Sequence, residues 1–312
     1  MAGANLPAKK YSKKSPTVTR LSFECSGSAT QFIDVAKALS IINRKFYRQG
    51  VYYYVNSVEI YNDETGVVDF HTLPDNWITK NAWNRGFKLF QKMNALAGPP
   101  LTSGQRGNYH DFKVFMNKRH LDTGTLDPSM YTINAGQSTY GADDWDYSQF
   151  VSADDDQDST ANADEFFVHM LGIHNGNPDN WESVGLIKSY AESRAMIPAQ
   201  SPTNSQDAVT DPLVNVFDMS SEEQMNDIVE NLQETNDEPP YDRDAYLGEL
   251  TNSMHHAARI GTEAGVGRIG RASGFCAPLG LICIDPHGVE SAFRVVLNLA
   301  VGTYHGVYAE RA

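Results

Sequence analysis

A run of acidic residues in the middle of the chain offers a set of ligands for a metal ion. Oxygen-bearing side chains occupy positions 1, 3, 5, 7, 9 and 12 of a twelve-residue stretch: Asp154, Asp156, Asp158, Thr160, Asn162 and Glu165. EF-hand loops use this spacing to surround calcium with oxygen atoms. The spacing indicates a calcium site whose acidic ligands are Asp154, Asp156, Asp158 and Glu165.

Two residues of this stretch depart from the EF-hand pattern. Ser159 stands where the loop normally turns on glycine, and Ala161 stands where a larger hydrophobic residue would anchor it. The flanking segments also look like strands instead of helices. Two interpretations therefore stay open, a calcium site and a solvated acidic loop.

The glycines 265, 267 and 270 match the GxGxxG pattern of dinucleotide-binding proteins. Such a site needs a strand directly before the glycines and a helix that begins within them. Here the preceding residues, 254–264, look helical and polar, and nothing resembling a βαβ unit surrounds the pattern. We interpret the glycines as a flexible connector and expect no cofactor.

The remaining reactive side chains are scattered. His255 and His256 are adjacent and would point to different sides of a helix, while His169 and His174 flank a predicted strand. The chain contains no HExxH, GxSxG or P-loop pattern. Because none of these residues forms a catalytic pattern, we expect a protein that is not an enzyme.

The three cysteines, Cys25, Cys276 and Cys283, do not suggest a disulfide framework or a CxxC site. We expect them to be small buried residues. The N-terminal lysines are followed by no apolar segment, and no apolar run approaches the ~20 residues of a membrane-spanning helix. We therefore expect folding in a cytoplasm.

Charge is distributed unevenly along the 312 residues. The net charge is +9 over residues 1–120, −24 over 121–250 and +1 over 251–312. Because phosphate contacts need Lys and Arg, the acidic middle third cannot wrap a nucleic acid. Any contact with nucleic acid would involve the N-terminal part.

The hydrophobic pattern predicts a β-rich chain with inserted helices. In the first predicted strand, Leu21, Phe23 and Cys25 alternate with polar residues. Further strands are expected at 51–61, 67–72, 112–116, 131–134, 147–151, 166–173, 274–284 and 293–308, with 51–72 forming a hairpin. Helices are expected within 30–48, after Pro74, after Pro178, after Ser220 and near 246–257.

One tetrapeptide occurs twice. Pro-Asp-Asn-Trp stands at 74–77 and again at 178–181, and each copy follows a predicted strand and opens a predicted helix. This repetition favours a duplicated unit. We expect a flexible basic arm at 1–16, a first β-barrel at 17–125 and a second at 126–312, enlarged by a helical insertion at 213–260.

With its short basic arm, its β-rich units with a helix in each and its acidic loops, the chain resembles the major capsid proteins of small tailless icosahedral viruses. Two tandem units resemble the double jelly-roll capsid proteins of membrane-containing phages, such as the lipid-containing phages that infect Flavobacterium. The resemblance implies a structural protein of the virion, made in the host cytoplasm. It also implies homotrimers in an icosahedral capsid lattice, contacts with minor capsid proteins, an internal membrane reached through the N-terminal arm, and no sequence-specific binding of nucleic acid.

Other architectures and functions remain open. A single jelly roll is the alternative fold, although coats of that kind which package nucleic acid directly usually carry a longer, Arg-rich arm. The alternative function is a β-sandwich carbohydrate-binding or adhesion protein, to whose aromatic surface Tyr52, Tyr53 and Tyr54 could contribute. A metal-dependent hydrolase would need a convergent His/Asp site that the sequence does not display.

If the acidic stretch binds calcium, chelation with EDTA will lower the melting temperature. An ion present at ~100 times its dissociation constant stabilises a fold by about 2.7 kcal/mol. Asp156→Ala should remove the sensitivity to EDTA, since it deletes one central ligand. A melting curve that is identical with and without EDTA would exclude the calcium site.

Overall fold

The computed structural model describes residues 16–96, 110–132, 136–141, 144–151, 165–177, 180–195, 226, 228–232, 234, 248, 252–263 and 269–312. The chain divides into two compact units. The first, which we call the sandwich unit, comprises Met1–Thr72, Thr125–Trp145 and His256–Ala312. The second, the insertion unit, comprises Leu73–Gly124 and Asp146–His255.

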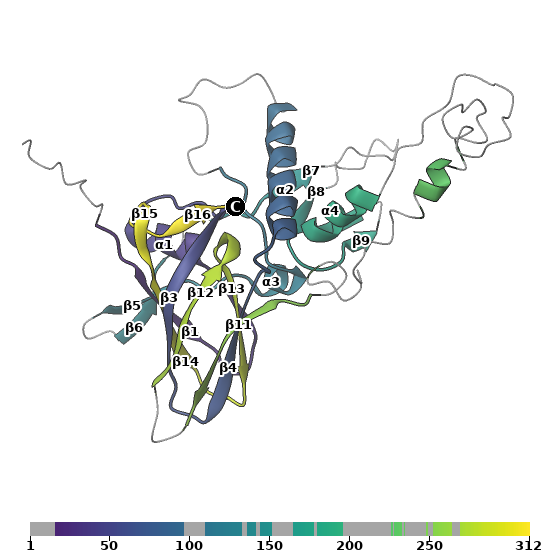
Figure 1. Cartoon of the computed structure of the whole chain (residues 1–312). Helices are drawn as coiled ribbons and strands as arrows, with labels where there is room; N and C mark the ends of the chain where they lie inside the picture. Colours follow the sequence, from purple (N-terminus) through teal and green to yellow (C-terminus); the bar gives the residue numbers. More distant parts are fainter. Residues whose placement is uncertain are drawn as a thin grey trace, which may run out of the picture. The chain divides into compact units, whose positions relative to one another are not determined.

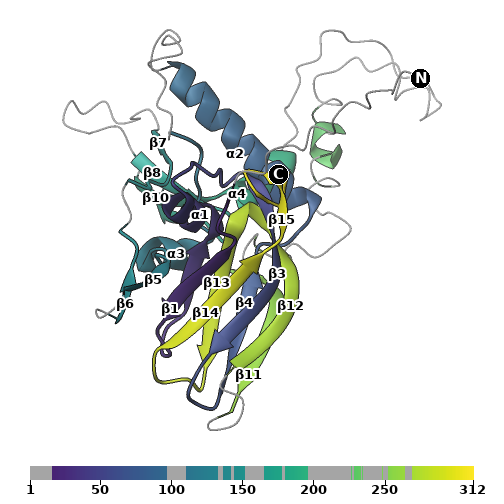
Figure 2. The ribbon, with the colours of Figure 1, turned by 90° about the vertical axis from the view of Figure 1, so that its left-hand side faces the viewer.

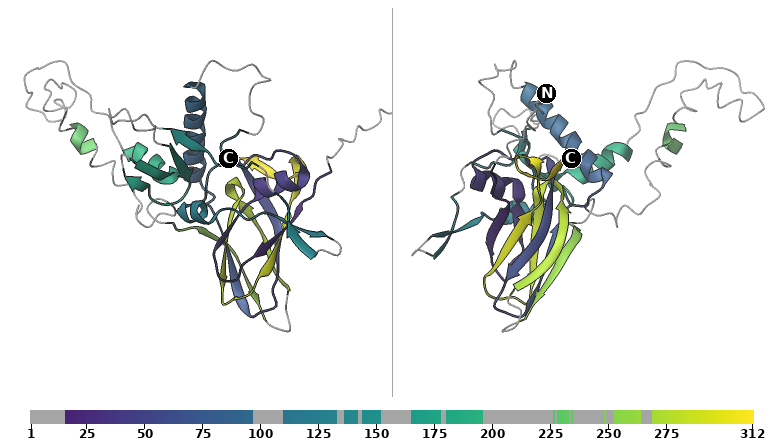
Figure 3. Two further views of the ribbon diagram at one scale, coloured as in Figure 1. Left: turned by 180° about the vertical axis from the view of Figure 1, so that it is seen from behind. Right: turned by 60° about the vertical axis from the view of Figure 1, so that its left-hand side comes forward.

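Two antiparallel sheets form the sandwich unit (Figure 1). Sheet A has the order β1 (Arg20–Cys25), β14 (Phe293–Leu299), β3 (Val51–Tyr61) and β12 (Ile269–Ala277), and β16 (Ala309–Arg311) also pairs with β3. Sheet B has the order β11 (His255–Thr262), β4 (Gly66–Thr72), β13 (Leu281–His287) and β2 (Gln31–Asp34). Figure 2 and Figure 3 show these strands from further directions.

The strand pairs of the sandwich follow a single rule. Among the eight main strands, the first pairs with the eighth, β1 with β14, then β2 pairs with β13 and β3 with β12. β4 and β11 complete the series as neighbours in sheet B. The eight strands thus behave as one long antiparallel ribbon that is folded over itself, and most of the insertion unit lies between β4 and β11 in the sequence.

Alternation of apolar and polar residues explains why these segments are strands. In β1, Leu21, Phe23 and Cys25 are buried while Arg20 and Glu24 are exposed. Inward-facing residues of both sheets share one core, and its members include Ile33, Val58, Ile60, Val68, Phe70, Ile260, Ile282, Ile284, Phe293, Val295 and Leu297. Burial of these side chains is the main stabilising term of the unit, at about 25 cal/mol per Å² of apolar surface.

Helix α1 (Val35–Asn43) is fixed to the sandwich by a fully buried carboxylate. Oδ1 of Asp34 accepts hydrogen bonds from the backbone N–H groups of Ala36 and Lys37, at 2.9 and 3.2 Å. Oδ2 accepts from Gln49 Nε2 at 3.1 Å and from Trp145 Nε1 at 3.2 Å. Burial raises the pKa of Asp34, while these four donors act in the opposite direction. One side chain therefore caps the helix and ties residue 145 to the sandwich.

Shorter elements complete the sandwich unit. β5 (Ser129–Thr132) and β6 (Gly136–Thr139) form a two-stranded ribbon. A short 3-10 helix, η1 (Pro278–Gly280), joins β12 to β13, and β15 (Val301–Tyr304) follows β14. At the bend of η1, Gly280 has a φ of +71° and lies against the ring of Tyr53, which leaves little room for a side chain.

The insertion unit packs helices with a small sheet. Its helices are α2 (Trp77–Leu96), α3 (Lys118–Thr123) and α4 (Leu186–Ala195). Its sheet has the order β7 (Gln149–Val151), β8 (Glu165–His169), β10 (Asn180–Gly185) and β9 (Asn175–Asn177). Rings of Trp83, Phe87 and Phe90 on α2 contact Phe112, and Phe150 of β7 joins them. No helix in the described residues is long and apolar enough to cross a membrane.

Many expected elements are confirmed. The fold is mainly β with inserted helices, and strands occur at 20–25, 51–61 and 66–72. The helix after Pro74 begins as expected, since the Asn76 side chain accepts a hydrogen bond from the N–H of Thr79. Residues 228–232 are helical, but the basic arm lies outside the described residues except for Pro16.

Three expectations about pairing and helices are wrong. β3 and β4 do not form a hairpin, because each belongs to a different sheet. Residues 255–257, expected at the end of a helix and of the helical insertion 213–260, lie in β11. The second Pro-Asp-Asn-Trp does not itself open the helix expected after Pro178, because Asn180 and Trp181 begin β10 and the helix, α4, starts only at Leu186.

The first copy leads directly into α2, whereas β10 separates the second copy from α4, and this difference removes the main support for a duplicated unit. The sandwich also differs from the expected division into barrels at 17–125 and 126–312. Strands from both sides of residue 125 pair within each of its sheets, as in the pairing of β1 with β14.

Asp34→Ala should lower the free energy of unfolding by about 3 kcal/mol, because it removes a helix cap and leaves buried donors without an acceptor. Asp34→Asn should cost less, since its amide oxygen can still accept from the helix N–H groups. Urea denaturation measures both changes. Asp144→Ala, a change at an exposed acid of the same unit, is the control. Equal stability of Asp34→Ala and the control would contradict the anchoring role.

Candidate functional site: charged clusters on the two sheets

The predicted metal ligands are only partly within the described structure. Asp154, Asp156 and Asp158 lie outside the described residues. Glu165 is the first residue of β8, where it is exposed and paired in register with Val151. Across the described ranges, no group of three or more His, Cys, Asp or Glu side chains is arranged to hold a metal ion. The calcium site therefore stays a prediction.

The other residues that the sequence singled out, namely the GxGxxG glycines, His169 and the cysteines, belong to the framework of the fold. The third glycine of the GxGxxG pattern, Gly270, lies in a strand, β12, and not in the helix that a dinucleotide site requires. His169 is buried, and its Nε2 lies 3.1 Å from the carbonyl oxygen of Ile173. Burial lowers the pKa of His169 to about 4. Cys25 and Cys283 are buried as expected, and Cys276 is half-buried.

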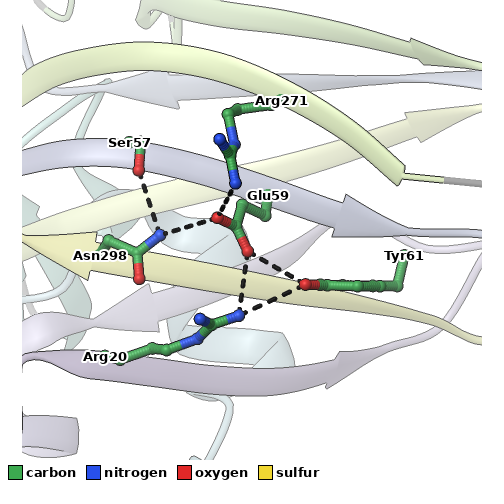
Figure 4. Close-up of polar contacts among 6 residues, drawn as sticks. All are labelled: Arg20, Ser57, Glu59, Tyr61, Arg271 and Asn298. Carbon is green, nitrogen blue, oxygen red and sulfur yellow. Dashed lines mark hydrogen bonds and ion pairs between the residues drawn. The ribbon is translucent and has the colours of Figure 1, made fainter.

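A buried carboxylate lies on the outer face of sheet A. Glu59 stands in β3 between Val58 and Ile60, which both face the core, so its own side chain faces outward. It is nevertheless only 5% exposed. Figure 4 shows the reason, since Arg20 and Arg271 approach Glu59 from opposite sides.

The contacts of Glu59 span all four main strands of sheet A. Its Oε2 accepts from Arg20 Nη2 of β1 at 3.0 Å and from the Tyr61 hydroxyl at 3.1 Å. Its Oε1 accepts from Arg271 Nη2 of β12 at 2.6 Å. Asn298 of β14 donates to the same oxygen at 3.4 Å. The cluster therefore braces the sheet across its width.

Electrostatics keep Glu59 ionised. Burial alone would raise its pKa, but hydrogen bonds from Tyr61 and Arg271 and the charge of Arg20 hold the pKa below its usual value. The two arginines remain more than half exposed, at 58% and 67%. Because the cations face solvent while the anion is buried, the cluster presents positive charge at the surface.

Sheet B carries a matching carboxylate. Asp69 of β4 lies between Val68 and Phe70 of the core, and only 4% of the residue is exposed. Arg259 of β11 binds it with both ends of the guanidinium, Nε to Oδ1 at 2.8 Å and Nη2 to Oδ2 at 2.9 Å. This bidentate geometry is the strongest form of an arginine–carboxylate contact.

Three histidines lie around the ion pair of Asp69 with Arg259. His256 Nε2 lies 3.1 Å from Oδ1 of Asp69, and His287 Nε2 lies 3.4 Å from Oδ2. The rings of His71 and His256 pack edge to face, with their centroids 5.4 Å apart. His287 also lies 3.5 Å from Asp285, whose other oxygen accepts from the Thr30 hydroxyl at 2.7 Å. Strands β11, β4 and β13 thus meet in one network.

The pKa shifts fit a bracing role better than proton transfer. Hydrogen bonding by Arg259 lowers the pKa of Asp69 to about 2, although burial acts in the opposite direction. Burial and the neighbouring His256 lower the pKa of His71. A general base needs a pKa near the working pH, and Asp69 lies far below it. The Asp69 network therefore holds β11, β4 and β13 together and presents the charge of Arg259 at the surface.

Sequence reasoning missed both clusters, although a signal was present. A single acid between core residues, as in Val58-Glu59-Ile60 and Val68-Asp69-Phe70, marks an outward position that needs a partner. The partner arginines could not be identified, because Arg271 and Arg259 follow their acids by about 200 residues.

No protein family, curated protein or solved structure matches this chain. The geometry of the described residues is therefore the basis of the function proposed below.

Asp69→Asn should flatten the loss of stability in acid. The pKa of Asp69 is about 2 in the folded chain, against ~3.9 for a free aspartate, so its stabilisation is present above about pH 4. It disappears as the pH falls through 2, because the unfolded chain binds the proton first. After allowance for solvent screening of the exposed partners, we expect about 1–2 kcal/mol.

Urea denaturation between pH 2 and 7 measures this effect. Glu263→Gln, a change at an exposed acid just after β11, is the control and should follow the parent protein. A constant difference between Asp69→Asn and the parent across this range would contradict the role of the Arg259 pair.

Proposed function

We propose that this chain is a structural protein, the major capsid protein of an icosahedral virus, and that its sandwich unit is a single jelly roll. The order of the strands is the observation that carries the proposal. A jelly roll has eight antiparallel strands in two sheets and arises when one long antiparallel ribbon rolls up. The pairing of β1 with β14, β2 with β13 and β3 with β12 supports this interpretation.

The distribution of strands between the sheets adds further support. In chain order the eight strands belong to sheets A, B, A, B, B, A, B and A. This sequence is symmetric about the tip of the ribbon, between β4 and β11. It is the order that rolling produces, whereas a sandwich of simple hairpins would keep consecutive strands in one sheet.

A single roll replaces the double roll expected from the repeated tetrapeptide. The insertion unit follows another plan, since β8 and β10 are parallel and its sheet mixes both directions. Jelly rolls tolerate long insertions at strand connections, because such segments need not disturb the sheet pairing. The proposed trimer would thus contain three rolls instead of six.

The packing of the three adjacent tyrosines weakens the carbohydrate-binding alternative. Tyr53 is fully buried in the core, and Tyr52 is only 8% exposed. The ring of Tyr54 contacts that of Tyr308 at 4.9 Å, and its hydroxyl lies near Glu310. These tyrosines serve packing within sheet A and do not form an open aromatic platform.

Self-assembly is the decisive test. The purified full chain should form trimers or uniform shells, visible by negative-stain electron microscopy and measurable by light scattering after size exclusion. Interfaces of such obligate assemblies bury more than ~2,000 Å². Assembly should therefore persist on dilution.

A core variant separates assembly from aggregation. Phe293→Ala opens a cavity between the sheets and should cost about 3–5 kcal/mol, so uniform particles should be lost with the fold. A monomer at every protein and salt concentration, together with glycan binding, would support the alternative function and reject the capsid.

A further inference from the structure

The exposed side of α2 is unusually basic for so acidic a chain. Lys80, Arg85, Lys88 and Lys92 are all exposed on this helix, and the helix contains no Asp or Glu. The whole chain has a net charge of −14. Four cations within thirteen residues therefore form a local reversal of charge, which we call the α2 basic face.

These cations repel one another without compensation from the helix. Lys88 and Lys92 are four residues apart, and Arg85 and Lys88 are three apart, so they are neighbours on the helix surface. Each like-charge pair destabilises a helix by about 0.2–0.5 kcal/mol. Among the described residues, the contact of the α2 basic face with another side chain is the hydrogen bond from Arg85 to Ser193 of α4, and no ion pair involves Lys80, Lys88 or Lys92. A partner anion would relieve this repulsion.

The opposite side of α2 holds the basic face in place. Ile78, Ala82, Trp83 and Phe90 are buried in the insertion unit. Gly86 permits close packing, since a Cβ there would approach the Phe112 ring to 3.0 Å and Leu186 to 3.2 Å. Because the helix is fixed by this packing, the four cations are spaced along about 18 Å of a fixed helix, at 1.5 Å per residue.

We propose that the α2 basic face binds the phosphate backbone of a nucleic acid without reading its sequence. The inference rests on the proposed function, since a capsid encloses a genome. A row of lysines and an arginine matches the requirement for phosphate neutralisation, and the acidic residues 121–250 cannot supply it. The amide of Gln91, also exposed on α2, can donate further hydrogen bonds to phosphate and sugar oxygens, whereas the amides of Asn81 and Asn94 contact Tyr190 and His110.

A lipid surface fits the same helix less well. An amphipathic helix binds a membrane by burying its apolar side in the lipid. The apolar side of α2 is already buried in protein, and its exposed side is mainly lysine and amide. The exposed Trp77, Leu89 and Leu96 are too few to replace that surface. Anionic lipid is therefore an outcome for the experiment to exclude.

Fluorescence anisotropy with a labelled 20-nucleotide oligothymidylate tests the proposal on the full chain. Each phosphate contact to a single strand contributes ~0.7 to the slope of log K against log salt. The double change Lys88→Gln and Lys92→Gln should reduce this slope by about 1.4 and weaken binding about 25-fold at 0.1 M salt. Melting curves confirm that the variant is folded.

A charge-matched control separates this face from overall charge. Arg44→Gln with Arg311→Gln removes two exposed cations from the sandwich unit and should change the slope by less than half as much. Equal effects in both double variants, or no binding by the parent, would overturn the inference. Tighter binding to vesicles containing 30% anionic lipid than to the oligonucleotide would also overturn it.

Electron microscopy of the Lys88→Gln and Lys92→Gln variant keeps the two proposals apart. If the variant forms shells and binds the oligonucleotide as the parent does, the proposal that the α2 basic face binds nucleic acid is wrong and the capsid proposal is retained. If neither protein assembles but oligonucleotide binding depends on the two lysines, the capsid proposal is wrong and the proposal of nucleic-acid binding by the α2 basic face is retained.

Discussion

The pairing of β14 with both β1 and β3 is the constraint on which the sandwich unit depends. It joins residues separated by more than 230 positions, and it places Val295 and Leu297 of β14 in the centre of the core. Such non-local contacts close large loops and slow folding. The core therefore cannot be completed until the C-terminal strands have paired with β1 and β3. Most of the insertion unit lies between β4 and β11 in the sequence, so it is part of the loop that this pairing closes.

Polar clusters act on this framework as lateral braces. Glu59 and Asp69 occupy equivalent situations, one on each sheet, where an outward acid is covered by arginines from other strands. Ion pairs of this kind contribute little net stability, since desolvation offsets much of the attraction, but breaking one leaves a buried charge. Their value lies in register, because a one-residue slip would turn Glu59 or Asp69 into the core.

Local sequence predicted elements better than pairing. Alternation located β1, and the first Pro-Asp-Asn-Trp located the start of α2, because both signals act within a few residues. The two copies of Pro-Asp-Asn-Trp show the limit. Asn76 caps a helix, whereas Asn180 pairs with Asn177 in a sheet, so tertiary context decides between identical segments. Residues 255–257 were mistaken for helix for the same reason, since β11 gains its strand partner from β4.

The uneven charge of the sequence acquires a structural meaning when it is counted by unit. The sandwich unit contains 14 basic and 13 acidic residues, and the insertion unit contains 11 and 26. In the proposed capsid, a nearly neutral unit would suit close packing of identical copies, because long-range repulsion between them is small. The insertion unit instead carries strong negative charge, within which α2 is a basic exception. Since surface repulsion is screened over about 8–10 Å at ordinary ionic strength, salt should govern contacts of the insertion unit far more than packing of the sandwich.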